Sequence, residues 1–434
     1  MLLINNYFYL FTSMESNNNN PKDENMDEEM QDKVEDLNQV GNDEEIIQEE
    51  DINKNEIDVD INDNDNNIPN DYIEMMDEEG FFQKEYPNFQ AEGEIYSIAL
   101  HPPSSTLIIG DGADTTSFYN VTLKTLIKTE KINKDSVNFL CFSFDNKYLL
   151  SASVDGTINI FDPSNNFSIL QTINEQDSEI NWVEWHPKGP AFSFGTAEGA
   201  IWVYVLTSSS KNENFNFYSH NSPTTAGSFI KEGKGLVSVG EDCAAKVYEL
   251  KTKTIKCTIK GKKYHQSPIT CLAVAKKKPI FATGTCEGEF ALAHYESGTV
   301  LHFMNNSSNT NSEMDISIEV IEFCNNEQYV VFADSSSKVN VFDLSMMQIR
   351  SVINLTSENI IKMIPSKQTP YEMFACGSNG NVYIFDTRGN GNIVMKEKLH
   401  NDVIMDFLVT ENEQFIMTSS LDKTINLVQI VNIN

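Results

Sequence analysis

The sequence is short of basic residues and has no long apolar run. Its 434 residues hold 31 Lys+Arg against 64 Asp+Glu, a formal net charge of −33. Because nucleic-acid binding needs a basic surface, this balance argues against direct contact with DNA or RNA and favours a basic protein segment as partner. Residues 1–11 are apolar, but Asn5 and Asn6 interrupt them and no basic residue precedes them. We therefore expect no signal peptide and no membrane span, and a cytoplasmic monomer with access to the nucleus.

Motifs for catalysis, metal binding and disulfide formation are also missing. The seven cysteines are odd in number and include no Cys-x-x-Cys pair, which favours reduced thiols in a reducing compartment. The glycine pairs, such as Gly110 with Gly112, lack the strand–helix context of a phosphate loop. No nucleophile elbow and no Cys/His cluster with metal spacing occurs. We expect no enzyme activity, no cofactor and no metal.

The negative charge is concentrated at the N-terminus. Residues 1–80 contain 25 acidic residues and three lysines, and they are rich in asparagine. Such a segment cannot bury enough apolar surface to offset its chain entropy, so we predict a disordered acidic Asn-rich tail over residues 1–79. Residues 80–434 are predicted to form one folded domain.

That domain repeats itself about every 43 residues, a period typical of β-propeller blades. The clearest unit, residues 149–162, is an apolar strand, an Asp155-Gly156 turn and an alternating strand that ends in Phe161-Asp162. The position of Phe161 recurs at Tyr119, Tyr204, Tyr248, Ala293, Phe342, Phe385 and Val428. We predict an all-β, WD40-type β-propeller with eight blades, and keep seven blades as the alternative because the first unit is degenerate.

The last unit has three strands and would leave an open sheet edge, which invites aggregation. Residues 81–90, which precede the first unit, contain four aromatic side chains. We predict that this stretch supplies the missing outer strand and closes the ring.

Three histidines recur at one position of the repeat, each followed by an acid in a later turn. The expected pairs are His220 with Asp242, His265 with Glu287, and His400 with Asp422. A histidine near a carboxylate can serve in acid–base catalysis. Because these pairs recur from blade to blade, we interpret them as structural staples. The pattern resembles the WD-repeat family, in which such a pair ties each blade and the Phe-Asp dipeptides stand as Trp-Asp.

The strongest local motif contains all three tryptophans. It runs Asn-Trp-Val-Glu-Trp-His-Pro over residues 181–187, then Gly-Thr-Ala-Glu-Gly over residues 195–199, then Trp202. Trp182 and Trp185 cannot point to one face of a strand, because their spacing is odd. Together with the acidic tail, the motif resembles the angio-associated migratory cell protein family, which includes a yeast chaperone dedicated to one large-subunit ribosomal protein.

That resemblance implies a binding propeller whose acidic top face captures the basic segment of a newly made large-subunit ribosomal protein. The carboxylates would steer Lys and Arg side chains and hydrogen-bond with them, and Trp185 would stack on an arginine. Some of these acids are expected only to cap turns. The candidate top-face residues are Asp135, Asp155, Asp177, Glu179, Trp185, Glu198, Glu241, Glu287, Asp315 and Glu358.

A competing motif is Phe385-Asp386-Thr387-Arg388, which contains one of the two arginines of the chain. It resembles the Trp-Asp-x-Arg element of propellers that present substrates to cullin-RING ubiquitin ligases. The alternative function is therefore an adaptor or scaffold in signalling, cell migration or ubiquitin ligation.

Overall fold

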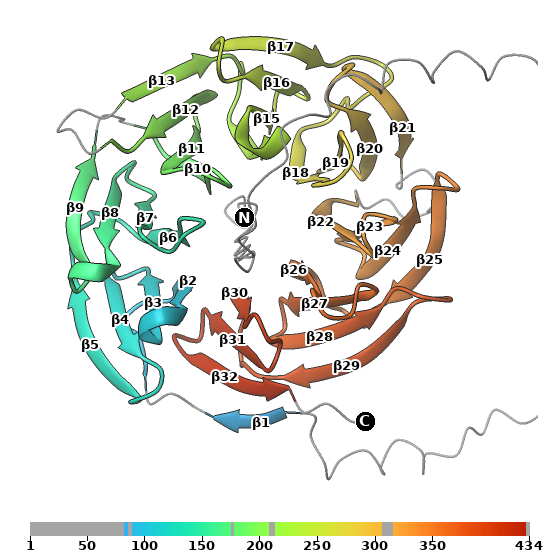
Figure 1. Cartoon of the computed structure of the whole chain (residues 1–434). Coiled ribbons are helices and arrows are strands. Elements are labelled where there is room, and N and C mark those ends of the chain that lie inside the picture. Colours follow the sequence, from blue (N-terminus) through green and yellow to red (C-terminus); the bar gives the residue numbers. More distant parts are fainter. Residues whose placement is uncertain (1–81, 86–88, 175–177, 208–212, 306–315, 431–434) are drawn as a thin grey trace, which may run out of the picture. The chain divides into compact units, whose positions relative to one another are not determined.

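Eight four-stranded antiparallel sheets surround a central axis like the blades of a propeller (Figure 1). The structure is a computed structural model, and it describes residues 82–85, 89–174, 178–207, 213–305 and 316–430. The predicted tail, residues 1–79, lies outside the described residues, and its boundary with the propeller stays a prediction. In each blade the first strand lies nearest the axis and the last lies at the rim. The prediction of an all-β propeller with eight blades is confirmed.

The strands of the first four blades follow one another along the chain. Blade 1 consists of β2 (Ile95–His101), β3 (Thr106–Asp111), β4 (Thr116–Asn120) and β5 (Thr125–Glu130). Blade 2 consists of β6 (Val137–Phe142), β7 (Leu149–Ser153), β8 (Ile158–Asp162) and β9 (Ser168–Ile173). Blade 3 consists of β10 (Ile180–Trp185), β11 (Ala191–Thr196), β12 (Ala200–Val205) and β13 (Glu213–Tyr218). Blade 4 consists of β14 (Thr224–Ile230), β15 (Gly235–Gly240), β16 (Ala245–Glu249) and β17 (Thr254–Ile259).

The next three blades repeat the arrangement. Blade 5 consists of β18 (Ile269–Val274), β19 (Ile280–Thr285), β20 (Glu289–His294) and β21 (Thr299–Asn305). Blade 6 consists of β22 (Ile318–Cys324), β23 (Tyr329–Asp334), β24 (Lys338–Asp343) and β25 (Gln348–Asn354). Blade 7 consists of β26 (Ile360–Pro365), β27 (Glu372–Gly377), β28 (Asn381–Asp386) and β29 (Asn392–Lys398). Three short 3-10 helices, η3 (Pro102–Ser104), η4 (Pro163–Asn165) and η5 (Lys231–Gly233), occupy connecting loops.

Blade 8 joins the two ends of the propeller. Its inner strands are β30 (Ile404–Val409), β31 (Phe415–Ser420) and β32 (Ile425–Ile430), and its outer strand is β1 (Phe82–Glu85). β1 pairs antiparallel with β32, with Phe82 opposite Ile430 and Glu85 opposite Leu427. The prediction that residues 81–90 supply the missing outer strand is confirmed. This pairing removes the open edge that blade 8 would otherwise expose.

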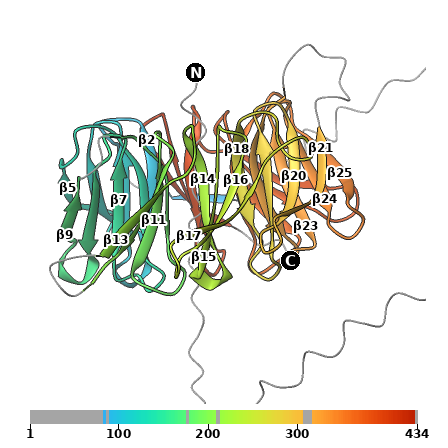
Figure 2. The ribbon, with the colours of Figure 1, turned by 90° about the horizontal axis from the view of Figure 1, so that it is seen from above.

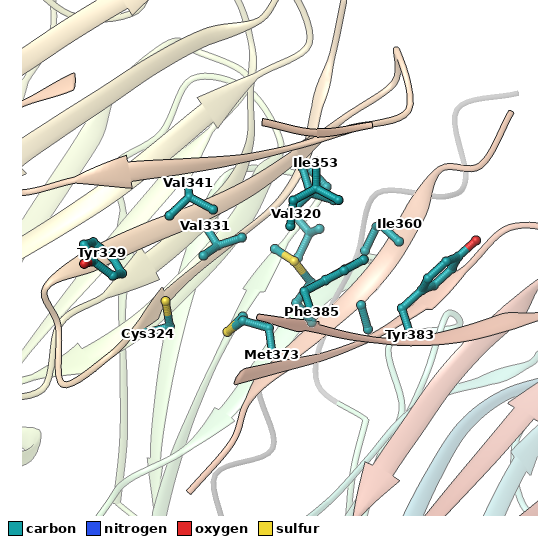
Figure 3. Packing of buried hydrophobic residues seen from close by; sticks show 14 residues of the cluster. Val320, Cys324, Tyr329, Val331, Val341, Ile353, Ile360, Met373, Tyr383 and Phe385 are labelled. Carbon is teal, nitrogen blue, oxygen red and sulfur yellow. The ribbon is translucent and has the colours of Figure 1, made fainter. Parts of the chain in front are cut away.

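The hydrophobic core is divided into eight clusters, one at each contact between neighbouring blades. Figure 3 shows the cluster between blades 6 and 7, where Val331 and Val341 of one sheet face Met373 and Phe385 of the next. The residue at the position of Phe161 lies in the third strand of each blade, and in all eight blades it is at most 2% exposed. Because both faces of each sheet are covered, strands such as Leu149–Ser153 are buried along their whole length, without alternation.

Candidate functional site

One face of the ring is built from two sets of loops, seen at one edge of the disc in Figure 2. One set precedes the inner strands, and the other joins the second and third strands. In every blade a backbone N–H of the second set donates to a carbonyl of the first, as from Ala197 to Glu179 (3.0 Å) and from Glu241 to Pro223 (2.9 Å). We call this face the top face. The hydrogen bonds hold the predicted acidic loops in fixed positions on this face.

Exposed carboxylates gather on the top loops of blades 1 to 4. We call this set the acidic arc: Glu92, Glu94, Asp135, Glu179, Glu198 and Glu241. Lys134 stands within it, and the loop before blade 5 carries Lys260, Lys262 and Lys263. Among the described residues the exposed carboxylates therefore concentrate on these four blades, and Asp402, which precedes β30 in blade 8, is also exposed. Glu287 is exposed on the neighbouring turn of blade 5.

Two other predicted acids serve the fold. Asp155 accepts hydrogen bonds from the backbone N–H groups of Lys134 (2.9 Å) and Thr157 (2.7 Å). Burial would raise the pKa of Asp155, but these hydrogen bonds outweigh it and lower the pKa. Glu358 is 1% exposed and accepts from Asn381 Nδ2 (2.6 Å) and the Tyr383 hydroxyl (3.0 Å). The prediction that Glu358 contacts a partner is wrong, because its carboxylate is buried and hydrogen-bonded to side chains of blade 7.

Trp185 is the second correction. Its indole is 8% exposed, stacks on Tyr148 and donates from Nε1 to the carbonyl of Cys141 (3.0 Å). It packs between blades 2 and 3, whereas Trp182 packs between blades 3 and 4, as their odd spacing requires. Trp185 therefore cannot stack on an arginine at the mouth. Asp177 and Asp315 lie outside the described residues.

Tyr96 is an aromatic side chain near the arc that the sequence reasoning missed. It is half-buried, and its hydroxyl and the Glu94 carboxylate lie near each other above Gly112. Burial raises the pKa of Tyr96, and the charges of Glu94 and Asp135 raise it further. A ring beside two carboxylates is a favourable place for a guanidinium group. Tyr96 is the second residue of β2, where the pairing with β3 is interrupted by a bulge.

That bulge recurs at the second residue of the inner strand in all eight blades. A bulge re-aims one side chain at the end of a strand. Thr225, Thr270 and Glu319, which hold this position in blades 4 to 6, line the cavity at the centre of the ring. In the sequence, these cavity-lining residues can be recognised only by their position directly after the first buried residue of the inner strand.

The histidine staples are present in blades 4, 5 and 8. His220 Nδ1 donates to Asp242 (2.9 Å), and its Nε2 lies 2.7 Å from the Ser238 hydroxyl. His400 is bound to Asp422 in the same way (3.0 Å). Burial lowers the pKa of both histidines and keeps them neutral at pH 7, although the paired acids oppose this shift. These pairs hold the top turns onto the sheets, as predicted.

The staple of blade 5 corrects the third predicted pair. His265 Nδ1 lies 3.4 Å from Glu289, and Glu287 stays exposed. Glu289 is the first residue of β20, so its side chain points back under the turn and also accepts from the backbone N–H of Gln266 (2.9 Å). Burial would raise the pKa of Glu289, but His265 and the neighbouring donors lower it to about 2.

Comparisons with known proteins agree with this geometry. A family model described as "WD domain, G-beta repeat" matches residues 124–162, and one described as a beta-propeller domain matches residues 292–434. The angio-associated migratory cell protein of Canis lupus familiaris is 24% identical over 338 residues, which cover 76% of this chain and 75% of that protein. The Homo sapiens protein is 23% identical over the same length. The chain is a WD-repeat β-propeller.

Solved structures share the fold of this WD-repeat propeller. Sqt1 of Saccharomyces cerevisiae matches with a TM-score of 0.71 and 18% identity, covering 81% of this chain and 98% of that one. Sqt1 of Chaetomium thermophilum bound to the N-terminus of the ribosomal protein L10 matches with a TM-score of 0.69 and 20% identity, covering 80% and 98%.

The arginine of the competing motif is held on the propeller itself. The Arg388 guanidinium donates to both oxygens of Asp386 (Nε–Oδ1 3.1 Å, Nη2–Oδ2 2.7 Å) and lies 3.5 Å from the ring centre of Tyr371.

None of the seven cysteines forms a disulfide. In the part of the WD-repeat propeller that the structure describes, no helix has the length and apolarity to cross a membrane, and no group of three or more His, Cys, Asp or Glu is placed to hold a metal.

Proposed function

We propose that this WD-repeat propeller is a non-catalytic binding protein that captures the basic segment of a newly made large-subunit ribosomal protein on its acidic arc. The single observation that carries the proposal is the arc itself, which gathers six exposed carboxylates on the top loops of blades 1 to 4. The Sqt1 structure with the N-terminus of ribosomal protein L10 supports it, because that propeller has the same fold and binds a ribosomal segment. We place this function in the cytoplasm, with access to the nucleus, and assign it to a monomer.

The physical basis is electrostatic steering followed by direct contact. Carboxylates held apart on rigid loops attract Lys and Arg side chains before contact and raise the association rate. Arg side chains can then form bidentate hydrogen bonds with single carboxylates, which set the register of the segment. Tyr96, beside Glu94 and Asp135, offers an aromatic face for one of these groups. Since the contact is charged and exposed, it should weaken as salt shortens the screening length from about 8 Å at 0.15 M to about 3 Å at 1 M.

The test is binding of the full chain to a peptide with the N-terminal sequence of ribosomal protein L10 of the same organism, measured by calorimetry. Glu179 and Glu198 are the residues to change, because the hydrogen bond from Ala197 brings their two loops together. We expect the double variant Glu179→Lys, Glu198→Lys to bind about 10- to 100-fold more weakly, since each reversal replaces an attraction of about 0.2–1 kcal/mol by a similar repulsion.

The matched control is Glu411→Lys, an exposed acid in the loop between β30 and β31 on the opposite face. It changes the net charge in the same direction and should leave the affinity unchanged at 0.15 M salt. Equal binding by the double variant and the parent chain would remove the acidic arc from the function.

The adaptor alternative rests on the likeness to the angio-associated migratory cell protein and on Arg388, whose side chain stays 57% exposed despite its contact with Asp386. It predicts a partner that binds independently of salt and loses affinity on Arg388→Ala. The six carboxylates of the acidic arc support capture of a basic segment more strongly than this single arginine supports the adaptor function.

A further inference from the structure

A cavity of about 50 Å³ lies at the centre of the ring, between the inner strands of blades 3 to 7. Its wall includes Trp182 and Glu184 of β10, Glu319 and Glu322 of β22, and Lys362 of β26. On this measure one water needs about 10–15 Å³, so the cavity has room for about four heavy atoms. Glu319 stands at the top end of its strand, next to the top loops, and Glu184 and Glu322 stand three residues deeper along theirs.

The carboxyl of Glu322 is buried without a charged partner in contact. The residue is 5% exposed, and its only hydrogen bond within the described chain comes from the backbone N–H of Phe323 (3.1 Å). One of its oxygens is therefore left without a donor, and Glu322 lines the cavity. Burying a carboxyl in this way costs free energy unless a ligand completes its hydrogen bonds.

The cations around the cavity do not fill that role. Lys362 is committed to Asp406 (Nζ–Oδ1 2.6 Å) and to the carbonyl of Phe407 (3.3 Å) on blade 8. Lys276 follows β18 in the loop on the bottom face; burial lowers its pKa, and the charges of Glu322, Glu327 and Glu184 oppose this shift. The cavity wall therefore carries the acids Glu184, Glu319 and Glu322 together with one cation, Lys362, which stands in the upper half of β26 and is already paired with Asp406.

We propose that this cavity binds the guanidinium or ammonium group of one Arg or Lys side chain. A guanidinium group has four heavy atoms and matches the volume, and its N–H donors match the carboxyls of Glu319 and Glu322. Both oxygens of Glu184 already accept hydrogen bonds, from the Ser228 hydroxyl and the backbone N–H of Phe229. This proposal rests on the proposed function for the source of the cation, which is a basic side chain of the segment held on the acidic arc.

The protonation of the site predicts its pH dependence. Burial raises the pKa of Glu184 and of Glu322 to about 8 each, although hydrogen bonds and the charges of Lys276 and Lys362 oppose it, and burial also raises the pKa of Glu319. With a pKa of about 8, Glu184 and Glu322 carry protons at pH 7, and a bound cation favours their charged forms. Cation affinity should therefore rise between pH 6 and pH 8, with release of protons, and level off above pH 8.5.

Trp182 provides a built-in probe, because it is one of three tryptophans and lines the cavity. We would follow the indole N–H resonances of the full chain, labelled with ¹⁵N-tryptophan, during titration with methylguanidinium chloride at constant ionic strength. We expect a saturable shift of the Trp182 signal and none for Trp185 or Trp202. Glu322→Gln, which keeps the shape and removes the charge, should weaken this binding at least tenfold at pH 8.

Glu319→Gln is a second variant in case Glu322→Gln does not fold, and it should weaken binding by at least threefold. A Trp182 signal that does not move, or that moves equally in parent and variants, overturns the proposal. The basic peptide must also shift the Trp182 signal; a shift by methylguanidinium alone would contradict the side chain as the source. The two proposals can be refuted separately. If the acidic arc does not bind the peptide, methylguanidinium can still shift the Trp182 signal. If the cavity does not bind methylguanidinium, peptide binding can still depend on salt.

Discussion

The buried ion pair between Lys362 and Asp406 joins three blades where the ring closes. Asp406 Oδ1 accepts from Lys362 of blade 7 (2.6 Å), and Oδ2 accepts from the backbone N–H of Ile98 in blade 1 (2.9 Å). The two side chains are 6% and 9% exposed. Breaking a buried pair from one side costs about 3–5 kcal/mol, because the remaining charge stays buried without its partner. For Asp406→Asn we expect the lower end, about 3 kcal/mol, since Lys362 keeps its hydrogen bond to the carbonyl of Phe407.

The double variant Lys362→Met, Asp406→Asn should recover most of that loss, to within about 1 kcal/mol of the parent, because no charge is left unpaired. The assay is urea unfolding followed by tryptophan fluorescence, with a melting temperature as a second readout, expected to fall by about 5–10 °C in Asp406→Asn. Lys147→Met is the control, since Lys147 pairs with Asp145 but is 73% exposed, and it should leave the midpoint unchanged. A loss below 1 kcal/mol in Asp406→Asn, or a double variant no more stable than the single one, would refute the reasoning.

Two further predictions concern packing and pH. A methyl group on Gly227 would overlap the Trp182 ring, so Gly227→Ala should lower the free energy of unfolding by about 1–3 kcal/mol, whereas Gly189→Ala, whose nearest neighbour is His186 Nδ1 at 3.4 Å, should change it little in the same urea assay. The depressed pKa of Glu289, about 2, means that its stabilising contribution is complete above its unfolded pKa of about 4.3 and is lost as pH falls toward 2. Glu289→Gln should therefore be less stable than the parent by about 1–2 kcal/mol at pH 7, and the difference should shrink to near zero at pH 2; a constant difference would contradict the assignment.

The fold could be predicted from the sequence because it consists of one repeated unit, whose strands are neighbours in the chain. The strand–turn–strand pattern of residues 149–162 and the recurrence of the Phe161 position at eight places indicated the blades that the structure contains. The closure by β1 was also predictable, because a three-stranded last unit needs a fourth strand and the chain has one apolar segment placed to supply it. His220 with Asp242 and His400 with Asp422 followed from their regular spacing.

The site depended on details that spacing does not encode. Glu287 and Glu289 stand two residues apart in one turn, and only the backbone path shows which of them reaches His265. Glu358 resembles the other loop acids in sequence, yet it is buried beneath Tyr383. Trp185 lies on the wrong side of its strand for the mouth, and Tyr96 gains its place from a bulge.

The sequence by itself determined the repeat and the acidic character of the top loops, because both arise from patterns within about 45 residues. It also indicated the ring closure, because the last unit lacks a fourth strand that the segment before the first unit can supply. Only the tertiary structure decided which carboxylates stay exposed and which are consumed by staples, and only it brought Glu184 and Glu322 to one cavity. These two residues are far apart in the chain and lie on blades 3 and 6, so their proximity exists only once the ring has closed. Burial then changes their chemistry, since a carboxyl removed from water has a raised pKa and holds its proton at pH 7.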